Sequence, residues 1–342
     1  MKLLSIFSTG VNSILPIVFL MLFGFVLRQR GFLSQEFVRI GNKLCFQYLL
    51  PMKLFLNAYK IGKFSEIPWR LVLFCMLLMM AVFFLGWLTA PLATKDARRK
   101  GVLLQSTFRS NTAIIGVTLA GILGGEPAEM VSAIMTAMFI PLMNVLAVIS
   151  LTIFLPHQDS KGNLKTVIRN VIRNPLIRGI GLGLGCVLLR EAEEKLFGRV
   201  VFALSGNLPF FYSAISQLGS IATVFALVVL GGQFSFSAAG NMGREIIVGT
   251  LWRNVLAPVI CLGGVYLAST YTGLIRCTSV DYPALVGLFA TPAAVSSAVM
   301  AGQMGNDEQL ATQIVVWTSV TSVVTLFVII CTLIGTGLIV PL

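Results

Sequence analysis

The chain alternates long apolar runs with short polar segments. A helix of about 20 apolar residues spans the ~30 Å hydrocarbon core of a bilayer. Applied along the chain, that rule predicts ten membrane-spanning helices at residues 11–29, 38–59, 69–91, 100–123, 128–154, 174–190, 211–231, 245–268, 282–304 and 310–338. The expected fold class is therefore an all-α polytopic membrane protein.

Polar residues interrupt the fourth and ninth runs near their centres. Each break lies 15 residues before a small acidic turn, from Asn111 to Glu126 and from Pro292 to Asp307. This matched spacing indicates an internal repeat. In hydrocarbon, an unpaired backbone group costs several kcal/mol, so an interrupted helix survives only where protein or a water-filled cavity satisfies it. Two such breaks in corresponding halves are a pointer to a transporter's binding site.

The repeat divides the chain into two units of five helices. We expect the first repeat at 1–155, a cytoplasmic linker at 156–173 and the second repeat at 174–342. Because five is odd, the second repeat enters the membrane from the opposite side, which gives inverted repeats. With the N-terminus outside, inner loops hold thirteen Lys and Arg against eight in outer segments. This excess places both termini outside.

Composition supports the membrane assignment and excludes other classes. The chain is 56% hydrophobic and 11% charged, whereas soluble domains are about 25% charged. The net charge of +12 does not indicate nucleic-acid binding, because the basic residues lie in short loops between apolar runs. His157 is the single histidine, so a histidine-based triad or multi-histidine metal site is excluded. We expect no cofactor, no metal and no enzyme activity.

Three basic residues lie deep within predicted spans, and no Asp or Glu lies comparably deep. They are Lys53, Arg109 and Arg253. A charge near the bilayer centre costs about 2.5 to 3.5 kcal/mol, so it usually faces a cavity or a partner. A positive cavity without acids suits an anion. The alternative for Lys53 and Arg253 is snorkelling or bonding to exposed helix carbonyls.

The breaks supply the candidate substrate contacts. Asn111 and Thr112 open a half-helix whose free amides carry roughly half a positive charge, which favours a carboxylate. Ser296, Ser297 and the freed amides after Pro292 offer hydrogen-bond donors to a carboxylate from the opposite side. Pro292 itself lacks an amide donor and breaks the helix. The alternative is that these side chains only hydrogen-bond neighbouring helices.

Further candidates flank the breaks or lie in the second span. Arg109 and Ser110 adjoin the first break, and Gln47 lies just before a mid-span proline, Pro51. Gln47 either lines the site or bonds a neighbouring helix. Pro51 and Pro292 are expected to be structural residues of the crossover. Weaker candidates of the same kind are Asn57, Asn144 and Gln217.

Five landmarks in order resemble the auxin efflux carrier family, of the bacterial type, whose members include malonate permeases and plant PIN-FORMED carriers. They are Asn42-Lys43-Leu44 through Leu50-Pro51 with Leu54-Phe55, Ser110-Asn111-Thr112 with Gly116, Arg173-Asn174-Pro175-Leu176-Ile177, Val229-Leu230-Gly231-Gly232, and Ala290-Thr291-Pro292 through Met300-Ala301. The resemblance implies two inverted five-helix repeats, with helices four and nine broken and crossing at the substrate site. It also implies a scaffold, a moving bundle and often a homodimer.

Residue by residue, the resemblance places the Asn-Thr of the first crossover on Asn111 and Thr112, and the proline of the second on Pro292. Plant carriers often have proline where this chain has Ser110, and their long cytoplasmic loop is absent. The chain therefore fits a small metabolic carboxylate better than auxin. The expected location is the bacterial inner (plasma) membrane.

These observations predict a secondary carrier that moves a small organic anion by alternating access around the crossover. The expected substrate is a carboxylate such as malonate or an auxin-like acid. Alternatives are an anion channel or passive pore, and a transporter-like membrane sensor. Uniport and coupling to protons or sodium ions both stay open.

Overall fold

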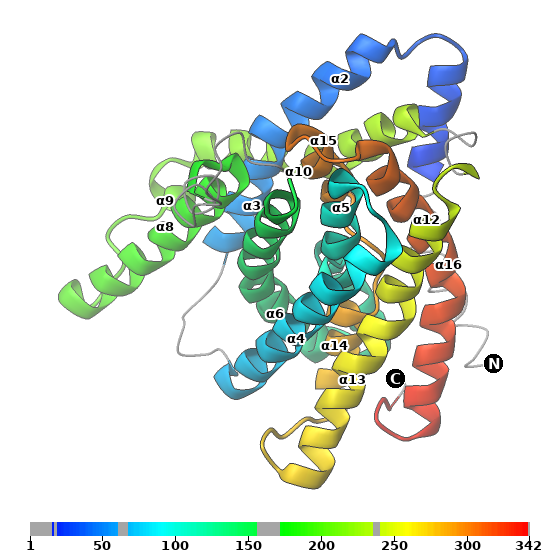
Figure 1. The fold of residues 1–342 in the computed structure, drawn as a ribbon. Helices are drawn as coiled ribbons and strands as arrows, with labels where there is room; N and C mark the ends of the chain where they lie inside the picture. The colour runs from blue at the N-terminus through cyan, green and yellow to red at the C-terminus, as the bar shows by residue number, and fades with distance from the viewer. Residues whose placement is uncertain (1–15, 17–18, 61–67, 156–171, 235–239, 341–342) are drawn as a thin grey trace.

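The computed structural model describes residues 16, 19–60, 68–155, 172–234 and 240–340, and these are predominantly helical (Figure 1). Within these ranges no strand forms beyond one isolated β-bridge. In the part of the chain that the structure describes, five helical stretches are long and apolar enough to cross a membrane: Trp69–Ala93, Leu119–Ile153, Pro209–Gly232, Gly243–Thr272 and Glu308–Gly335. The predicted all-α membrane class is confirmed, and the chain is a multi-pass membrane protein. The start of the first predicted span lies outside the described residues.

Shorter helical segments occupy the region of the predicted second span, namely α2 (Gln35–Leu44), η1 (Cys45–Leu49) and α3 (Leu50–Tyr59). The described elements that follow are α4 (Trp69–Ala93), α5 (Ala97–Phe108), η3 (Thr112–Gly116), α6 (Val117–Ile153), α8 (Pro175–Phe197), α9 (Leu204–Asn207), α10 (Pro209–Gln233), α12 (Gly243–Leu251), η4 (Trp252–Leu256), α13 (Ala257–Leu267), η5 (Ala268–Thr272), α14 (Asp281–Phe289), α15 (Ser296–Gln303) and α16 (Glu308–Gly335). Within α6 the backbone turns at Gly125, where φ is 71°, so α6 is two helical segments rather than one.

Side-chain caps fix where several helices begin. The Asp96 carboxylate accepts the Arg98 amide ahead of α5. Asn174 accepts the Leu176 amide at 2.9 Å ahead of α8. Such caps satisfy amide donors that have no acceptor inside the helix.

Two π-helical turns precede prolines at the same spacing. η1 ends at Leu49 and η4 ends at Leu256, each two residues before a proline, Pro51 and Pro258. Proline has no amide hydrogen and its ring clashes with the carbonyl four residues earlier. A locally widened turn relieves that clash without ending the helix.

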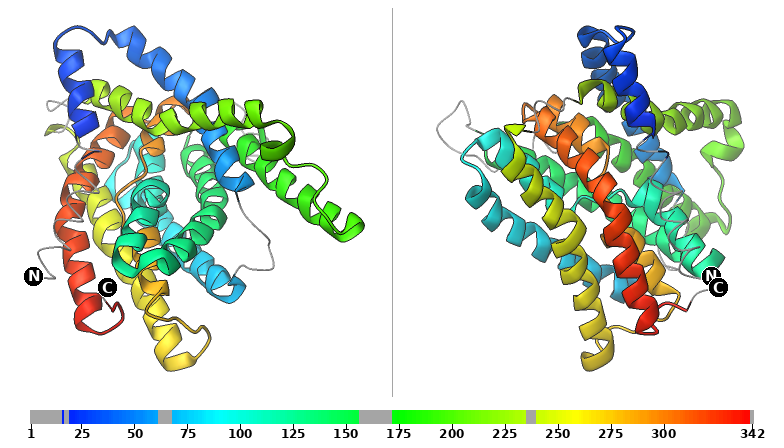
Figure 2. Two further views of the ribbon diagram at one scale, coloured as in Figure 1. Left: turned by 180° about the vertical axis from the view of Figure 1, so that it is seen from behind. Right: turned by 90° about the vertical axis from the view of Figure 1, so that its right-hand side faces the viewer.

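The helices pack as two groups. In the first, α2, η1, α3, α8 and α10 lie against one another, and the second contains α4, α5, α6 and α12 to α16 (Figure 1). Glycine permits the closest approach in the first group. A Cβ atom at Gly179 or Gly183 of α8 would lie closer than 3.0 Å to the carbonyl oxygen of Pro51 or Phe55. In the second group, α12 and α16 run side by side (Figure 2, right).

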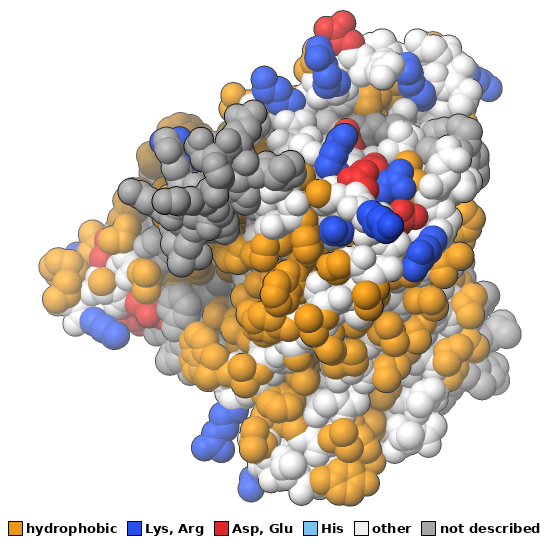
Figure 3. Space-filling view, viewed as in Figure 1, with side chains coloured by type: hydrophobic (Ala, Val, Ile, Leu, Met, Phe, Trp, Pro, Cys, Tyr) orange, Lys and Arg blue, Asp and Glu red, His pale blue; other side chains and the backbone are white. Residues whose placement is uncertain are grey.

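The surface is divided in the manner of a membrane protein. Figure 3 shows hydrophobic side chains over the middle of one face and charged side chains gathered at its upper end. Among these charges, Arg99 pairs with Glu245 at 2.9 Å and with Asp307 at 3.0 Å. This cluster joins the first turns of α5 and α12 to the residue that caps α16.

Candidate functional site

Both polar runs interrupt their helices, and the two breaks pair with each other. α5 ends at Phe108 and η3 starts at Thr112, while α14 ends at Phe289 and α15 starts at Ser296. The Asn111 amide donates to the Pro292 carbonyl at 2.8 Å. In return, the Ala294 amide donates to the Arg109 carbonyl at 3.1 Å. Backbone groups freed by one break are thus satisfied by the other, as hydrocarbon surroundings require.

Ser110 satisfies a carbonyl that Pro292 leaves free. In a continuous helix the Leu288 carbonyl accepts the amide of residue 292, but proline has no amide hydrogen. The Ser110 hydroxyl donates to that Leu288 carbonyl instead. A serine in the first break therefore complements the proline in the second, and the helix is interrupted without a proline at position 110.

The helices beside the breaks cross with their backbones in contact. A Cβ atom at Gly116 would lie closer than 3.0 Å to the Gly287 carbonyl oxygen, and a Cβ atom at Gly287 equally close to the Gly116 carbonyl oxygen. Only glycine at both positions allows this approach. These two glycines therefore set how closely η3 approaches α14.

A cavity of about 70 Å³ lies where the breaks face the first group of helices. Its walls come from α3, α8 and α10 on one side and from the breaks and α6 on the other. The lining residues are Leu50, Lys53, Leu54, Asn57, Arg109, Ser110, Asn111, Thr112, Ala113, Ile140, Met143, Asn144, Leu176, Thr223, Ala226, Ala294, Val295 and Ser296. In this part of the described chain the lining contains two cations and no carboxylate.

Arg109 is held in the cavity wall by neutral groups. Only 3% of it is exposed. Its guanidinium donates to Asn144 Oδ1 at 2.8 Å and to Ser296 Oγ at 3.0 Å, and it also contacts Gln105 and Met300. No salt bridge involves Arg109 among the described residues. These groups orient its positive charge, and none of them neutralises it.

The second cation, Lys53, enters the cavity from the opposite wall. It lies on α3, two residues after Pro51, and its ammonium donates to the Thr223 hydroxyl on α10. Thr223 was not predicted from the sequence, because a single threonine inside an apolar run carries no distinguishing pattern. Contact with Lys53 arises only when α3 and α10 pack together.

Neutral polar groups complete the wall. Asn111 and Thr112 are buried and line the cavity, and the Thr112 hydroxyl lies 2.9 Å from that of Thr136. The first amides of a helix have no acceptor inside it, and at the start of α15 those of Ser297 and Ala298 donate to the Ala294 and Val295 carbonyls. Ser296 lines the cavity, whereas Ser297 is buried outside the lining, and its hydroxyl has no partner in the described structure.

Three other candidates lie elsewhere. Gln47 is exposed on η1 and does not line the cavity. Pro51 lies near the start of α3, in neither break. Arg253 is buried outside the cavity lining and donates to the Thr107 and Phe289 carbonyls. The alternative of bonding to exposed helix carbonyls therefore describes Arg253, whereas Lys53 faces the cavity.

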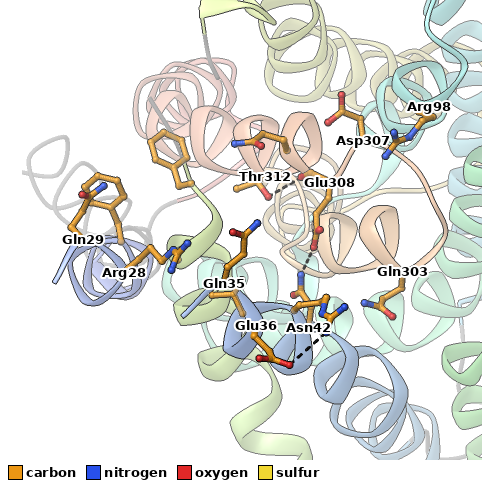
Figure 4. Close-up of a pocket in the computed structure, with 16 residues that line it drawn as sticks. Arg28, Gln29, Gln35, Glu36, Asn42, Arg98, Gln303, Asp307, Glu308 and Thr312 are labelled. Atoms are coloured by element: carbon orange, nitrogen blue, oxygen red, sulfur yellow. Dashed lines mark hydrogen bonds and ion pairs between the residues drawn. The ribbon is translucent and has the colours of Figure 1, made fainter. Parts of the chain in front are cut away.

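A larger cavity of about 1250 Å³ opens at the charged end of the molecule (Figure 4). Its lining mixes signs, with Arg28, Arg39 and Arg98 beside Glu36, Asp307 and Glu308. Here Asn42 donates to Glu308, joining the start of the second span to the start of α16. Because its acids and bases balance, this cavity has less preference for anions than the smaller one.

Comparison with known proteins assigns the chain to a family. The family model described as "Membrane transport protein" matches residues 9–166 and 161–330. The chain is also 24% identical over 298 residues to an uncharacterized transporter of Methanocaldococcus jannaschii, an alignment that covers 85% of this chain and 88% of that protein. The resemblance to auxin efflux carriers is thereby confirmed at the level of the family. The chain belongs to the membrane transport protein family.

Proposed function

We propose that the chain is a secondary carrier for a small organic anion, which binds in the small cavity at the paired breaks. The observation that carries this proposal is the lining itself, which contains Lys53 and Arg109 and no carboxylate among the described residues. A bound carboxylate supplies the missing counter-charge. Arg109, Asn111, Thr112 and Ser296 then hold it, together with amides at the start of η3.

Charge and size both favour a small dicarboxylate. Two cations match the two negative charges of malonate better than the single charge of an auxin-like acid. The cavity volume of about 70 Å³ is several times the ~10–15 Å³ that a water occupies by a comparable measure. An aromatic acid requires the walls to move apart before it can enter.

Alternating access follows from the division into two helix groups. We propose that α2, α3, α8 and α10 form the scaffold and that the other group moves against it, within two inverted five-helix repeats. Gly125 (φ 71°) and Gly305 (φ 75°) support the repeat, since each turns the chain after a broken helix. The family resemblance and charge distribution support a homodimer in a bacterial inner membrane with both termini outside. Uniport, driven by the substrate gradient and the membrane potential, fits the absence of an acid from the described lining.

Uptake into proteoliposomes tests the proposal. We expect entry of labelled malonate to saturate with concentration and to be inhibited by other small carboxylates, because each transport cycle must occupy one site. Current that rises with voltage and does not saturate indicates a channel. Binding without any flux indicates a sensor. Either result contradicts the proposed function.

Lys53→Met tests whether the second cation selects a dianion. We expect the apparent affinity for malonate to fall about tenfold and that for a monocarboxylate such as propionate to change less than threefold, because one charged pair near a protein surface is worth on the order of 1 to 4 kcal/mol. Thr223→Val is the matched control, since it removes the hydroxyl beside Lys53 but keeps the charge. Equal losses for both acids contradict the assignment.

A further inference from the structure

Arg253 connects the two broken helices from the side away from the cavity. It belongs to η4, in the turn that widens ahead of Pro258. Only 1% of it is exposed, and it is absent from the lining of the small cavity. Its guanidinium donates to the Thr107 carbonyl at 3.2 Å and also to the Phe289 carbonyl. One side chain therefore touches the last turn of α5 and the last residue of α14.

Both carbonyls lose their usual helical partners where the helices break. In a continuous helix the Thr107 carbonyl accepts the amide of Asn111, but that amide donates to Pro292. The Phe289 carbonyl similarly accepts the amide of Ala293, but that amide donates to Thr318 Oγ1 at 3.1 Å. Arg253 replaces the lost partner of each carbonyl. The same guanidinium thus compensates for both interruptions.

The positive charge of Arg253 also suits this position, in addition to its hydrogen bonds. Each half-helix presents about half a negative charge at its C-terminal end. Two such ends meet at the breaks, so together they carry about one negative charge. A single guanidinium offsets it. Without that offset, the same region opposes an anion bound at the neighbouring cavity.

We propose that Arg253 is a positioning residue for the anion site, which it serves without touching the anion. It holds the ends of α5 and α14 in one register and cancels their negative potential, so that Arg109 and the half-helix amides stay directed at the anion. The proposal rests on the proposed function only for its effect on anion affinity. The bridging of the two breaks is independent of it.

Substitution of Arg253 tests the two parts separately. Arg253→Gln removes the charge and one of the bridging donors, and we expect malonate to bind about tenfold more weakly, at the upper end of helix-dipole effects. Amide hydrogen exchange in segments 109–116 and 290–296 is expected to quicken, because the breaks lose their bridge. Arg253→Lys restores the charge, and we expect its malonate affinity to return to within threefold of wild type.

Arg244→Gln is the matched control, because Arg244 starts the same helical stretch and also donates to one backbone carbonyl, that of Leu92, but is exposed. It should leave malonate affinity and amide exchange unchanged.

Amide exchange and malonate affinity that stay at wild-type values in Arg253→Gln overturn the proposal, as does equal loss of affinity in the Gln and Lys variants. If the Gln variant does not fold, amide hydrogen exchange is measured in Arg253→Lys instead. Wild-type exchange rates in both segments then overturn the bridging role. A wild-type protein that binds no malonate refutes the proposed function, whereas the exchange comparison still tests the bridge.

Discussion

Arg109→Gln should weaken malonate binding at least about 100-fold while leaving the protein folded. The guanidinium is buried and its partners among the described residues are neutral, so in the proposed function the bound anion supplies its counter-charge. Removing one partner of a buried ion pair costs about 3 to 5 kcal/mol, and each 1.4 kcal/mol is a factor of ten in affinity. Isothermal titration with malonate in detergent measures the loss.

The stability of the same variant gives an independent check. An unpaired buried charge opposes folding, so neutral glutamine should keep or raise the melting temperature of the ligand-free protein. Arg39→Gln is the control for lost charge, because Arg39 lines the larger cavity and its side chain is 79% exposed. It should bind malonate within twofold of wild type. Wild-type affinity in Arg109→Gln contradicts the assigned site.

Gly287→Ala should destabilise the protein through a clash between two helix backbones. The added Cβ meets the backbone oxygen of Gly116 closer than 3.0 Å, and a backbone cannot rotate away as a side chain can. Overpacking usually costs about 1 to 3 kcal/mol. We therefore expect the apparent melting temperature to fall by roughly 1 to 4 °C, and malonate uptake to be lost as the paired breaks shift.

Gly263→Ala is the matched control on a neighbouring helix. A Cβ atom there has no neighbour within 4 Å, and alanine is the better helix former by about 1 kcal/mol. Its melting temperature should therefore equal or exceed that of wild type. An unchanged melting temperature in Gly287→Ala contradicts the close crossing of the helices.

The breaks could be found from the sequence because a helix in hydrocarbon is interrupted only where protein or water satisfies the freed backbone groups, so polar residues within an apolar run are conspicuous. Asn111 and Pro292 stood out against apolar neighbours, and their spacing to the acidic turns related one to the other. Their hydrogen-bonded pairing could not be predicted, because it joins residues 181 positions apart. Contacts of this kind depend on how whole helices pack.

The sequence could not predict which of the buried cations faces the cavity. Lys53 and Arg253 have similar sequence surroundings, because each is a positive charge deep in an apolar run near a proline. Lys53 follows Pro51, and Arg253 precedes Pro258. In the structure Lys53 faces the cavity and Arg253 faces two helix ends. Which face of a helix points inward is decided by its neighbours, and nearly uniform hydrophobicity around a buried helix leaves no stripe to read. Gln47, for which the sequence left two roles open, is exposed on η1 and outside the lining of the small cavity.

The most direct test of the central claim is the position of a bound anion. A crystal structure with bromomalonate, measured at the bromine absorption edge, locates the ligand without relying on the shape of its density. The bromine signal is expected in the small cavity, with the carboxylates within hydrogen-bonding distance of Arg109 and Lys53. A signal confined to the larger cavity beside Arg39 and Arg98, with the small cavity empty, would contradict it.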